Sequence, residues 1–212
     1  STAVAIENQR RASDLGVDAG LVVAPYYNKP NQEGLFQHFS AVAGAVGIPI
    51  IFYSVPGRTI VDLGVDTIAR LHEAHANIIG VKDATGNMER ASMQRSKLGP
   101  DFILLSGDDS SALGFNAHGG HGCISVTANV APRLCSQMQT LSLAGDFTAA
   151  RAINDRLAYL HKDLFMEPNP SPAKYVAHRL DPCANEMRLP LVPISKPTRD
   201  AMDFAIAHAG LI

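Results

Sequence analysis

The sequence is poor in cysteine, with three among 212 residues, and Cys123, Cys135 and Cys183 lack the CxxC spacing of a zinc or redox motif. An odd number of cysteines does not build a disulfide framework, so we expect buried thiols in a reducing, cytoplasmic environment. The eight histidines show no HExxH or comparable spacing. We therefore expect no metal site.

Long hydrophobic runs are also missing. The longest, such as residues 48–52 and 78–81, have the length of a strand and not of a membrane-spanning helix. The first residues lack the basic-then-apolar order of a signal peptide. The net charge is −2, and the 18 lysines and arginines are scattered without a basic stripe. We therefore expect neither a membrane nor a nucleic acid as a partner.

What the sequence does have is a repeated alternation of apolar strands and amphipathic helices. Strands are expected at residues 19–24, 49–53, 77–82, 102–106 and 123–126. The first has the continuous apolar pattern of a strand that is buried on both faces. Helices are expected from Thr2 to about Gly16 and at 35–46, 65–71, 88–97 and 131–144. Such repeats, at intervals of roughly 20–30 residues, are typical of a parallel α/β fold.

The strands cease after Gly145. Asp146 can cap a helix with apolar residues from 150 to 164, and two more helices are expected near 173–180 and 198–209. We expect residues 1–145 to form part of a (β/α) barrel, from its third helix through its eighth unit. Residues 146–212 would then form a helical extension packed on that barrel.

A closed barrel is favoured over an open doubly wound sheet. An open sheet that binds a nucleotide would carry GxGxxG or GxxxxGK[ST] after an early strand, and neither motif follows the first three strands. The glycine cluster at 119–122 precedes a strand and predicts a tight turn. The strand–helix repeats therefore fit a barrel better.

Functional side chains of a parallel barrel gather where the strands end, because all carboxyl ends share one face. Lys82 directly follows the apolar residues 78–81, so its amine starts from a low-dielectric position. Such a position favours the neutral amine, which is the nucleophile that attacks a ketone. A lysine that reaches solvent or pairs with Asp83 is the alternative.

Two further side chains suit the same kind of site. Tyr53, on the neighbouring strand, can relay protons, or it is a core tyrosine bonded to backbone. Arg58 has a planar guanidinium that suits a carboxylate, although a loop arginine is often only solvated. The pair Asp108 and Asp109 is more typical of a helix cap than of a cation site.

Several stretches resemble the dihydrodipicolinate synthase branch of the pyruvate-dependent class I aldolases. They are PYYNKP at 25–30, YSVPGRT at 53–59, GVKDATG at 80–86, LSGDD at 105–109, ISVTAN at 124–129 and NPSP at 169–172. The strand-ending lysine is shared with sialic acid lyases and keto-deoxy sugar acid aldolases. The Gly-Arg-Thr and Gly-Asp-Asp stretches favour the dihydrodipicolinate branch. The resemblance covers essentially the whole chain and implies a (β/α)8 TIM barrel.

The resemblance implies a Schiff-base lyase of lysine and diaminopimelate biosynthesis. Such an enzyme condenses pyruvate with L-aspartate 4-semialdehyde to give 4-hydroxy-tetrahydrodipicolinate. Lys82 would form the imine with pyruvate, which requires no separate cofactor. Tyr53 would relay protons, and Arg58 would hold the carboxylate of the aldehyde.

Other site residues are implied in the same way. Backbone groups of Gly107, Asp108 and Ile124 would line the substrate pocket. Tyr27 would reach across a subunit interface into the partner's proton relay, within a homodimer or homotetramer. Tyr26 matches a residue of the allosteric site of lysine-regulated relatives.

The chain departs from the family pattern in two places. Five strands are three fewer than a barrel has, so about 80 residues of an eight-unit barrel, with the family's Gly-Thr-Thr-Gly-Glu turn, are expected to precede it. Val4 stands where lysine-regulated relatives have glutamate, and a valine does not pair with an ammonium group. Another pyruvate-dependent aldolase, of the sugar acid or sialic acid lyase type, and a catalytically inactive fragment remain as alternatives.

Overall fold

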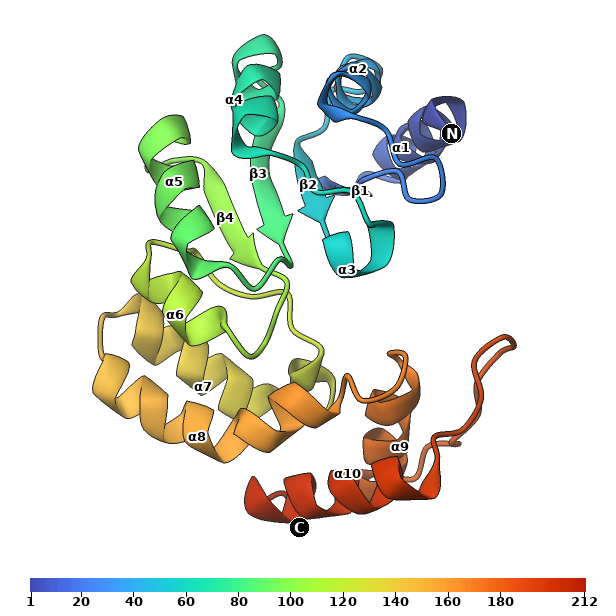
Figure 1. Ribbon diagram of the computed structural model, residues 1–212, viewed down its shortest axis with the longest axis vertical. Helices are drawn as coiled ribbons and strands as arrows, with labels where there is room; N and C mark the ends of the chain where they lie inside the picture. The colour runs from blue at the N-terminus through green and yellow to red at the C-terminus, as the bar shows by residue number, and fades with distance from the viewer. The chain divides into compact units, whose positions relative to one another are not determined.

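The computed structural model describes all residues from Ser1 to Ile212 (Figure 1). The chain divides into two compact units. Unit 1 comprises Ser1–Asp108 and His118–Gly122, and it contains the sheet. Unit 2 comprises Asp109–Ala117 and Cys123–Ile212, and its regular structure is helical. The boundary predicted after Gly145 stays a prediction.

Four parallel strands form the sheet of unit 1, in the order in which they occur in the chain. They are β1 (Gly20–Val23), β2 (Ile50–Ser54), β3 (Ile78–Asp83) and β4 (Ile103–Ser106). The helices of this unit are α1 (Thr2–Asp14), α2 (Gln32–Ala43), the short α3 (Pro56–Thr59), α4 (Val65–Ala74) and α5 (Met88–Leu98). Four of the five predicted strands and the four longer helices are confirmed, whereas the turn of helix α3 was not predicted. The result is the parallel strand–helix arrangement of a (β/α) barrel (Figure 1).

The two faces of this sheet carry different side chains, because successive residues of a strand point to opposite sides. One row across the four strands is buried against the helices. Its Phe52 packs against Phe39 of α2, with ring centroids 4.6 Å apart and the rings tilted by 57°. This row contains Val22, Phe52, Val81 and Leu104. The next row, on the opposite face, contains Val23, Tyr53, Lys82 and Leu105. The helices therefore leave the face of Lys82 uncovered.

This difference overturns the prediction that residues 19–24 are buried on both faces. Leu21 and Val23 are 45% and 40% exposed, whereas Val22 between them is buried. The pattern Gly-Leu-Val-Val is apolar on both sides, but helices pack on only one of them.

The predicted strand at 123–126 is also wrong, since only Cys123 forms a bridge. The two residues before Cys123 do bond to β4. His121 N–H donates to Leu104 C=O, and Gly122 C=O accepts from Ser106 N–H. Further along, the Asp109 carboxylate accepts the N–H groups of residues 126 and 127, at 2.8 and 3.2 Å. Those donors are then not available to a ladder, and the chain turns into the 3₁₀ helix η1 (Thr127–Asn129).

Unit 2 is built from helices around an apolar core. They are α6 (Ala112–Ala117), α7 (Pro132–Leu143), α8 (Phe147–Asp163), α9 (Ser171–Leu180) and α10 (Lys196–His208). The last four were predicted, and Asp146 caps α8 as expected by accepting the Ala149 N–H at 3.0 Å. Leu157, Leu160, Val176, Met202 and Ile206 lie in this core. No helix of either unit is both long and apolar enough to cross a bilayer.

The cysteines are all free thiols, but they are not all buried as predicted. Cys135 is buried, and burial raises the pKa of its thiol to about 11. Cys183 is exposed, because it lies in the irregular segment between α9 and α10. The prediction of buried thiols is therefore wrong for Cys183.

The contact between β3 and β4 depends on the missing side chain of Gly80. A Cβ added there would lie 2.6 Å from the carbonyl oxygen of Ile103 and 2.8 Å from its Cβ. Because one neighbour is backbone, the strands would have to separate, and we expect Gly80→Ala to destabilise the protein by about 1–3 kcal/mol. Urea denaturation measures this change. Gly47→Ala is the matched control, since its added Cβ meets no atom within 4 Å, and equal midpoints for both variants would contradict the prediction.

Candidate functional site

Lys82 and Tyr53 are brought together by the register of two neighbouring strands. They are directly paired in the parallel ladder of β2 and β3, so both side chains leave the same face of the sheet. The Nζ atom of Lys82 lies 4.1 Å from the centroid of the Tyr53 ring. Both residues are partly buried. The structure therefore confirms that the strand-ending lysine has the tyrosine as its neighbour.

The surroundings of Tyr53 favour its protonated form. Burial raises the pKa of the phenol, and the positive charge of Arg58 acts in the opposite direction. A phenol that keeps its proton at neutral pH can donate it to an oxygen that leaves as water. The pair thus combines an amine and a proton donor at the end of two strands.

Gly107 gives Lys82 the space in which it lies. A Cβ on Gly107 would come within 2.9 Å of Lys82 Cε and 3.2 Å of its Cγ. The same Cβ would lie 2.7 Å from the Cβ of Ala84. Gly107 is fixed in turn, because its N–H donates to the carbonyl oxygen of Asp83 at 2.7 Å. The aliphatic stem of the lysine therefore packs directly on the backbone that follows β4.

Asp83 follows Lys82 in sequence but points to the opposite face. Its carboxylate accepts from Arg90 Nε at 2.6 Å and from Gln94 Nε2 at 2.9 Å. Thr85 donates to the other carboxylate oxygen through its N–H and its hydroxyl. These partners of the Asp83 carboxylate lie on the helix side, and the alternative in which Lys82 pairs with Asp83 is not supported.

Sequence reasoning did not identify Arg90 and Gln94. Both lie on the sheet side of α5, where Gln94 is fully buried. Their i, i+4 spacing on the buried face of an amphipathic helix is the signal that could have found them, because buried polar side chains need partners.

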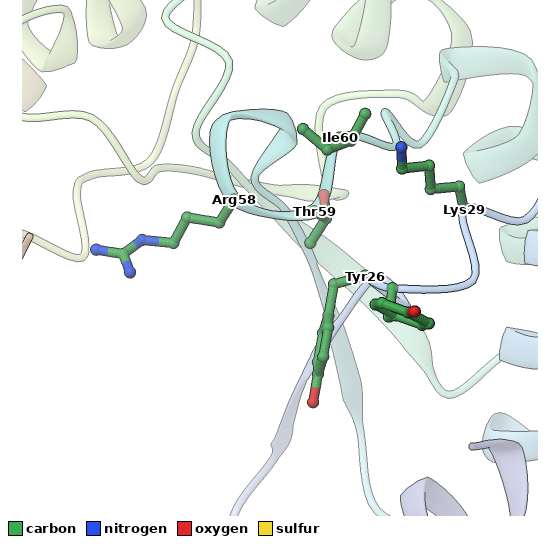
Figure 2. Close-up of a pocket in the computed structure, with 6 residues that line it drawn as sticks. Tyr26, Lys29, Arg58, Thr59 and Ile60 are labelled. Atoms are coloured by element: carbon green, nitrogen blue, oxygen red, sulfur yellow. The ribbon is translucent and has the colours of Figure 1, made fainter. Parts of the chain in front are cut away.

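Arg58 lies in a pocket of unit 1 with a volume of about 600 Å³. The lining residues are Tyr26, Tyr27, Lys29, Arg58, Thr59 and Ile60 (Figure 2). The Arg58 side chain extends from α3 away from Tyr26 and Lys29 (Figure 2). Lys29 and Arg58 give the lining of this pocket positive charge, which suits an anion, with the Arg58 guanidinium directed to one side of it.

The backbone that carries Arg58 is held under strain. Ile60 ends α3 with φ 64°, a left-handed conformation that is unfavourable for a β-branched residue. Buried Thr59 supports this conformation, because its Oγ1 lies 2.8 Å from Val61 C=O and 3.1 Å from Val55 C=O. Arg58 is therefore attached to a segment whose conformation is fixed on both sides.

The remaining predicted site residues lie in different places. Tyr26 and Tyr27 follow β1 and are 66% and 90% exposed. Asp108 follows Gly107 after β4, and its N–H donates to Ser106 Oγ at 3.1 Å. Ile124 belongs to unit 2 and is 41% exposed. The roles of these residues stay predictions.

The structure has no group of three or more His, Cys, Asp or Glu side chains with an arrangement that could hold a metal ion.

The close contact at Gly107 leads to a test of the site. The sequence predicts an imine on Lys82. We expect Gly107→Ala to displace the Lys82 stem and to slow that predicted reaction roughly tenfold to hundredfold, because small misplacements of a nucleophile have large effects on rate. The measurement is the rate of adduct formation at Lys82 with pyruvate and borohydride. Gly47→Ala serves again as the control, and a Gly107→Ala variant that reacts at the original rate would refute the role of this contact.

Comparison with known proteins gives a consistent result. The sequence profile described as the dihydrodipicolinate synthetase family matches residues 1–209. The 4-hydroxy-tetrahydrodipicolinate synthase of Methylobacterium radiotolerans is 56% identical over 212 residues, which are all of this chain and 71% of that protein. The synthase of Bartonella bacilliformis is 53% identical over the same 212 residues, or 72% of its length.

A solved structure agrees with the sequence matches. The chloride-inhibited dihydrodipicolinate synthase from Acinetobacter baumannii, complexed with pyruvate, superimposes with a TM-score of 0.96 and is 45% identical. The alignment covers all of this chain and 72% of that one. With the register of Lys82 and Tyr53 and these matches in agreement, the chain belongs to the dihydrodipicolinate synthetase family.

Proposed function

We propose that the protein condenses pyruvate with L-aspartate 4-semialdehyde to 4-hydroxy-tetrahydrodipicolinate through an imine on Lys82. The observation that carries this proposal is the position of Lys82 Nζ over the Tyr53 ring, at the carboxyl ends of two parallel strands. The relatives support the choice of substrates, since they are named as synthases of this product and one of them was solved with pyruvate. No second activity has an observation in its favour.

The chemistry follows from an amine beside a proton donor. The neutral amine of Lys82 adds to the keto carbon of pyruvate, and the resulting carbinolamine loses its hydroxyl group as water, with the proton supplied through Tyr53. The imine makes the methyl group acidic, so loss of one proton gives an enamine. The enamine carbon then bonds to the aldehyde carbon, whose oxygen takes up a proton. Finally the amino group of the bound aldehyde substrate attacks the imine carbon, closes the ring and releases Lys82.

The other residues would bind and orient the substrates. Arg58 holds the carboxylate of the aldehyde, which is supported by the charge of its pocket and by the fixed conformation of α3. Backbone groups of Gly107 and Asp108 line the pyruvate pocket. The covalent carrier is the chain's own lysine, and no separate cofactor takes part in these steps.

We also propose that like chains associate and that Tyr27 contributes to the proton relay of the partner. This assignment is supported by its side chain, which is 90% exposed at the end of β1. Tyr26 beside it is proposed to contact a regulatory ligand, while Val4 on α1 offers no charge to such a ligand. The exposed free thiol of Cys183 favours a reducing compartment, the cytoplasm.

The covalent step gives a direct prediction. Incubation with pyruvate and borohydride should add one reduced pyruvate unit at Lys82, which peptide mass spectrometry locates. Lys82→Arg should abolish this adduct, because a guanidinium keeps its charge and does not add to ketones. An adduct at Lys29 or Lys174 in the unaltered protein would assign the reaction to another residue.

The aldehyde-binding role of Arg58 is tested separately. Arg58→Ala should raise the KM for aspartate semialdehyde by a factor that corresponds to about 1.5–3 kcal/mol, while the KM for pyruvate changes little. Steady-state kinetics with each substrate varied in turn gives both constants. Arg70→Ala is the control, since Arg70 pairs with Glu33 at the surface of α4 and α2. Equal effects of Arg58→Ala on both substrates would remove Arg58 from this role.

A further inference from the structure

A single guanidinium ties together segments of unit 1 that are far apart in the chain. Arg90, in the first turn of α5, donates from Nε to Asp83 Oδ2 at 2.6 Å and from Nη1 to Asp62 Oδ2 at 2.7 Å. Its Nη2 donates to the carbonyl oxygen of Leu63. The side chains of Arg90 and Asp83 are 11% and 1% exposed. The side chain of Asp62 is 45% exposed. All three nitrogens of Arg90 are thus used, and the pair with Asp83 is closed to solvent whereas the pair with Asp62 lies at the edge of the solvent.

The acceptors of Arg90 belong to the ends of two strands. Asp83 is the last residue of β3. Asp62 is linked to the last residue of β2, since Ser54 Oγ donates to Asp62 Oδ1 at 3.0 Å. Ser54 and Asp83 are paired in the parallel ladder. Arg90 therefore closes a connection between the ends of β2 and β3 on the side of the helices.

The strand geometry carries this connection to the opposite face. Tyr53 and Lys82 immediately precede Ser54 and Asp83, and successive strand residues point to opposite sides. A shift of the Asp83 backbone therefore moves the Lys82 side chain on the other face. The same shift would move Gly107, whose N–H is bonded to Asp83 C=O and on which the lysine packs.

The carboxylate of Asp83 needs Arg90 in order to stay where it is. Arg90 is ion-paired with Asp83, with 2.6 Å between Nε and Oδ2. Without this charge the buried carboxylate would have to take up a proton or move toward water, because an isolated buried charge is strongly unfavourable. Gln94 and Thr85 would keep their neutral hydrogen bonds to it. Loss of Arg90 should therefore loosen the strand end without removing all its contacts.

We propose that Arg90 is a positioning residue for imine formation: it fixes the ends of β2 and β3 so that the Lys82 amine stays beside Tyr53. Arg90 touches neither substrate nor the reacting atoms, and it acts through Asp83 and Asp62. The inference rests on the proposed function, since it concerns the reaction of Lys82 with a keto acid.

The experiment compares three variants of the full-length protein. Arg90→Met removes the charge and every hydrogen bond, whereas Arg90→Lys keeps the charge but cannot span three acceptors. Arg70→Met is the matched control, because Arg70 also joins two segments of unit 1, through Glu33, but at the surface and away from the strand ends. The measured quantities are the melting temperature and the rate constant of borohydride-trapped imine formation at Lys82, per folded molecule and at saturating pyruvate.

A positioning role predicts a specific pattern. Arg90→Met should lower the rate constant roughly tenfold to hundredfold while the half-saturating pyruvate concentration changes less than about threefold, because the nucleophile and not the binding pocket is displaced. Arg90→Lys should lie between this variant and the unaltered protein, and Arg70→Met should react at the original rate. A lower melting temperature with an unchanged rate constant in Arg90→Met would overturn the inference.

The experiment also distinguishes two further outcomes, a variant that does not fold and the absence of any adduct. If Arg90→Met does not fold, Asp62→Asn decides the matter, since it leaves the pair of Arg90 and Asp83 intact and weakens only the connection to β2. This variant should slow imine formation about threefold or more, and an original rate would reject the positioning role. Absence of any adduct at Lys82 in the unaltered protein would overturn both the proposed function and the inference, whereas an adduct that forms equally fast in all variants overturns the inference alone.

Discussion

The parallel pairing of β2 with β3 is the constraint on which the site depends. It places Tyr53 opposite Lys82 and Ser54 opposite Asp83, so one ladder of backbone hydrogen bonds aligns two pairs of side chains at once. A slip of one residue would send Lys82 to the helix side and would bring Asp83 to the face of the reaction. The ladder continues beyond the strands, where Ala84 N–H donates to Ser54 C=O and Gly107 N–H donates to Asp83 C=O. The chemistry of the site is therefore determined by backbone register before any side chain makes a contact.

The alternation of a strand also separates two environments. The helix side holds a buried ionic network around Asp83. The groups that donate to its carboxylate belong to Arg90 and Gln94 of α5 and to Thr85 in the turn before that helix. The opposite side holds an amine on an aromatic ring and a glycine that leaves space. Asp83 thus anchors the strand end on one face, while Lys82 carries the amine on the other, and the two side chains do not compete for the same contacts. This division explains how a lysine can be held firmly without being neutralised by the carboxylate next to it in sequence.

Much of this arrangement could be predicted from the sequence, because it depends on local patterns. Short apolar runs located four strands, and a lysine at the end of one of them pointed to the site. The predicted fifth strand at 123–126 failed because a carboxylate 17 residues away, that of Asp109, accepts the N–H of Val126. The contacts of Arg90 with Asp62 and Leu63 span 28 and 27 residues and leave no periodic trace in the sequence. Contacts of this kind depend on tertiary packing, which a pattern of apolar residues does not encode.

The left-handed backbone of Ile60 lowers the stability of the folded protein, but it also restricts the conformations of the segment that carries Arg58. Glycine adopts this conformation without steric cost, so a glycine at position 60 would relieve the strain at the end of α3. The same glycine would give the segment more conformations, and an arginine on a mobile support binds a planar carboxylate less well. The protein keeps a residue with an unfavourable backbone conformation at the edge of the pocket for which an anionic substrate group is proposed. Selection for thermal stability alone would therefore tend to exchange Ile60. Under the role proposed for Arg58, that exchange would weaken carboxylate binding, a conflict between stability and function at one backbone angle.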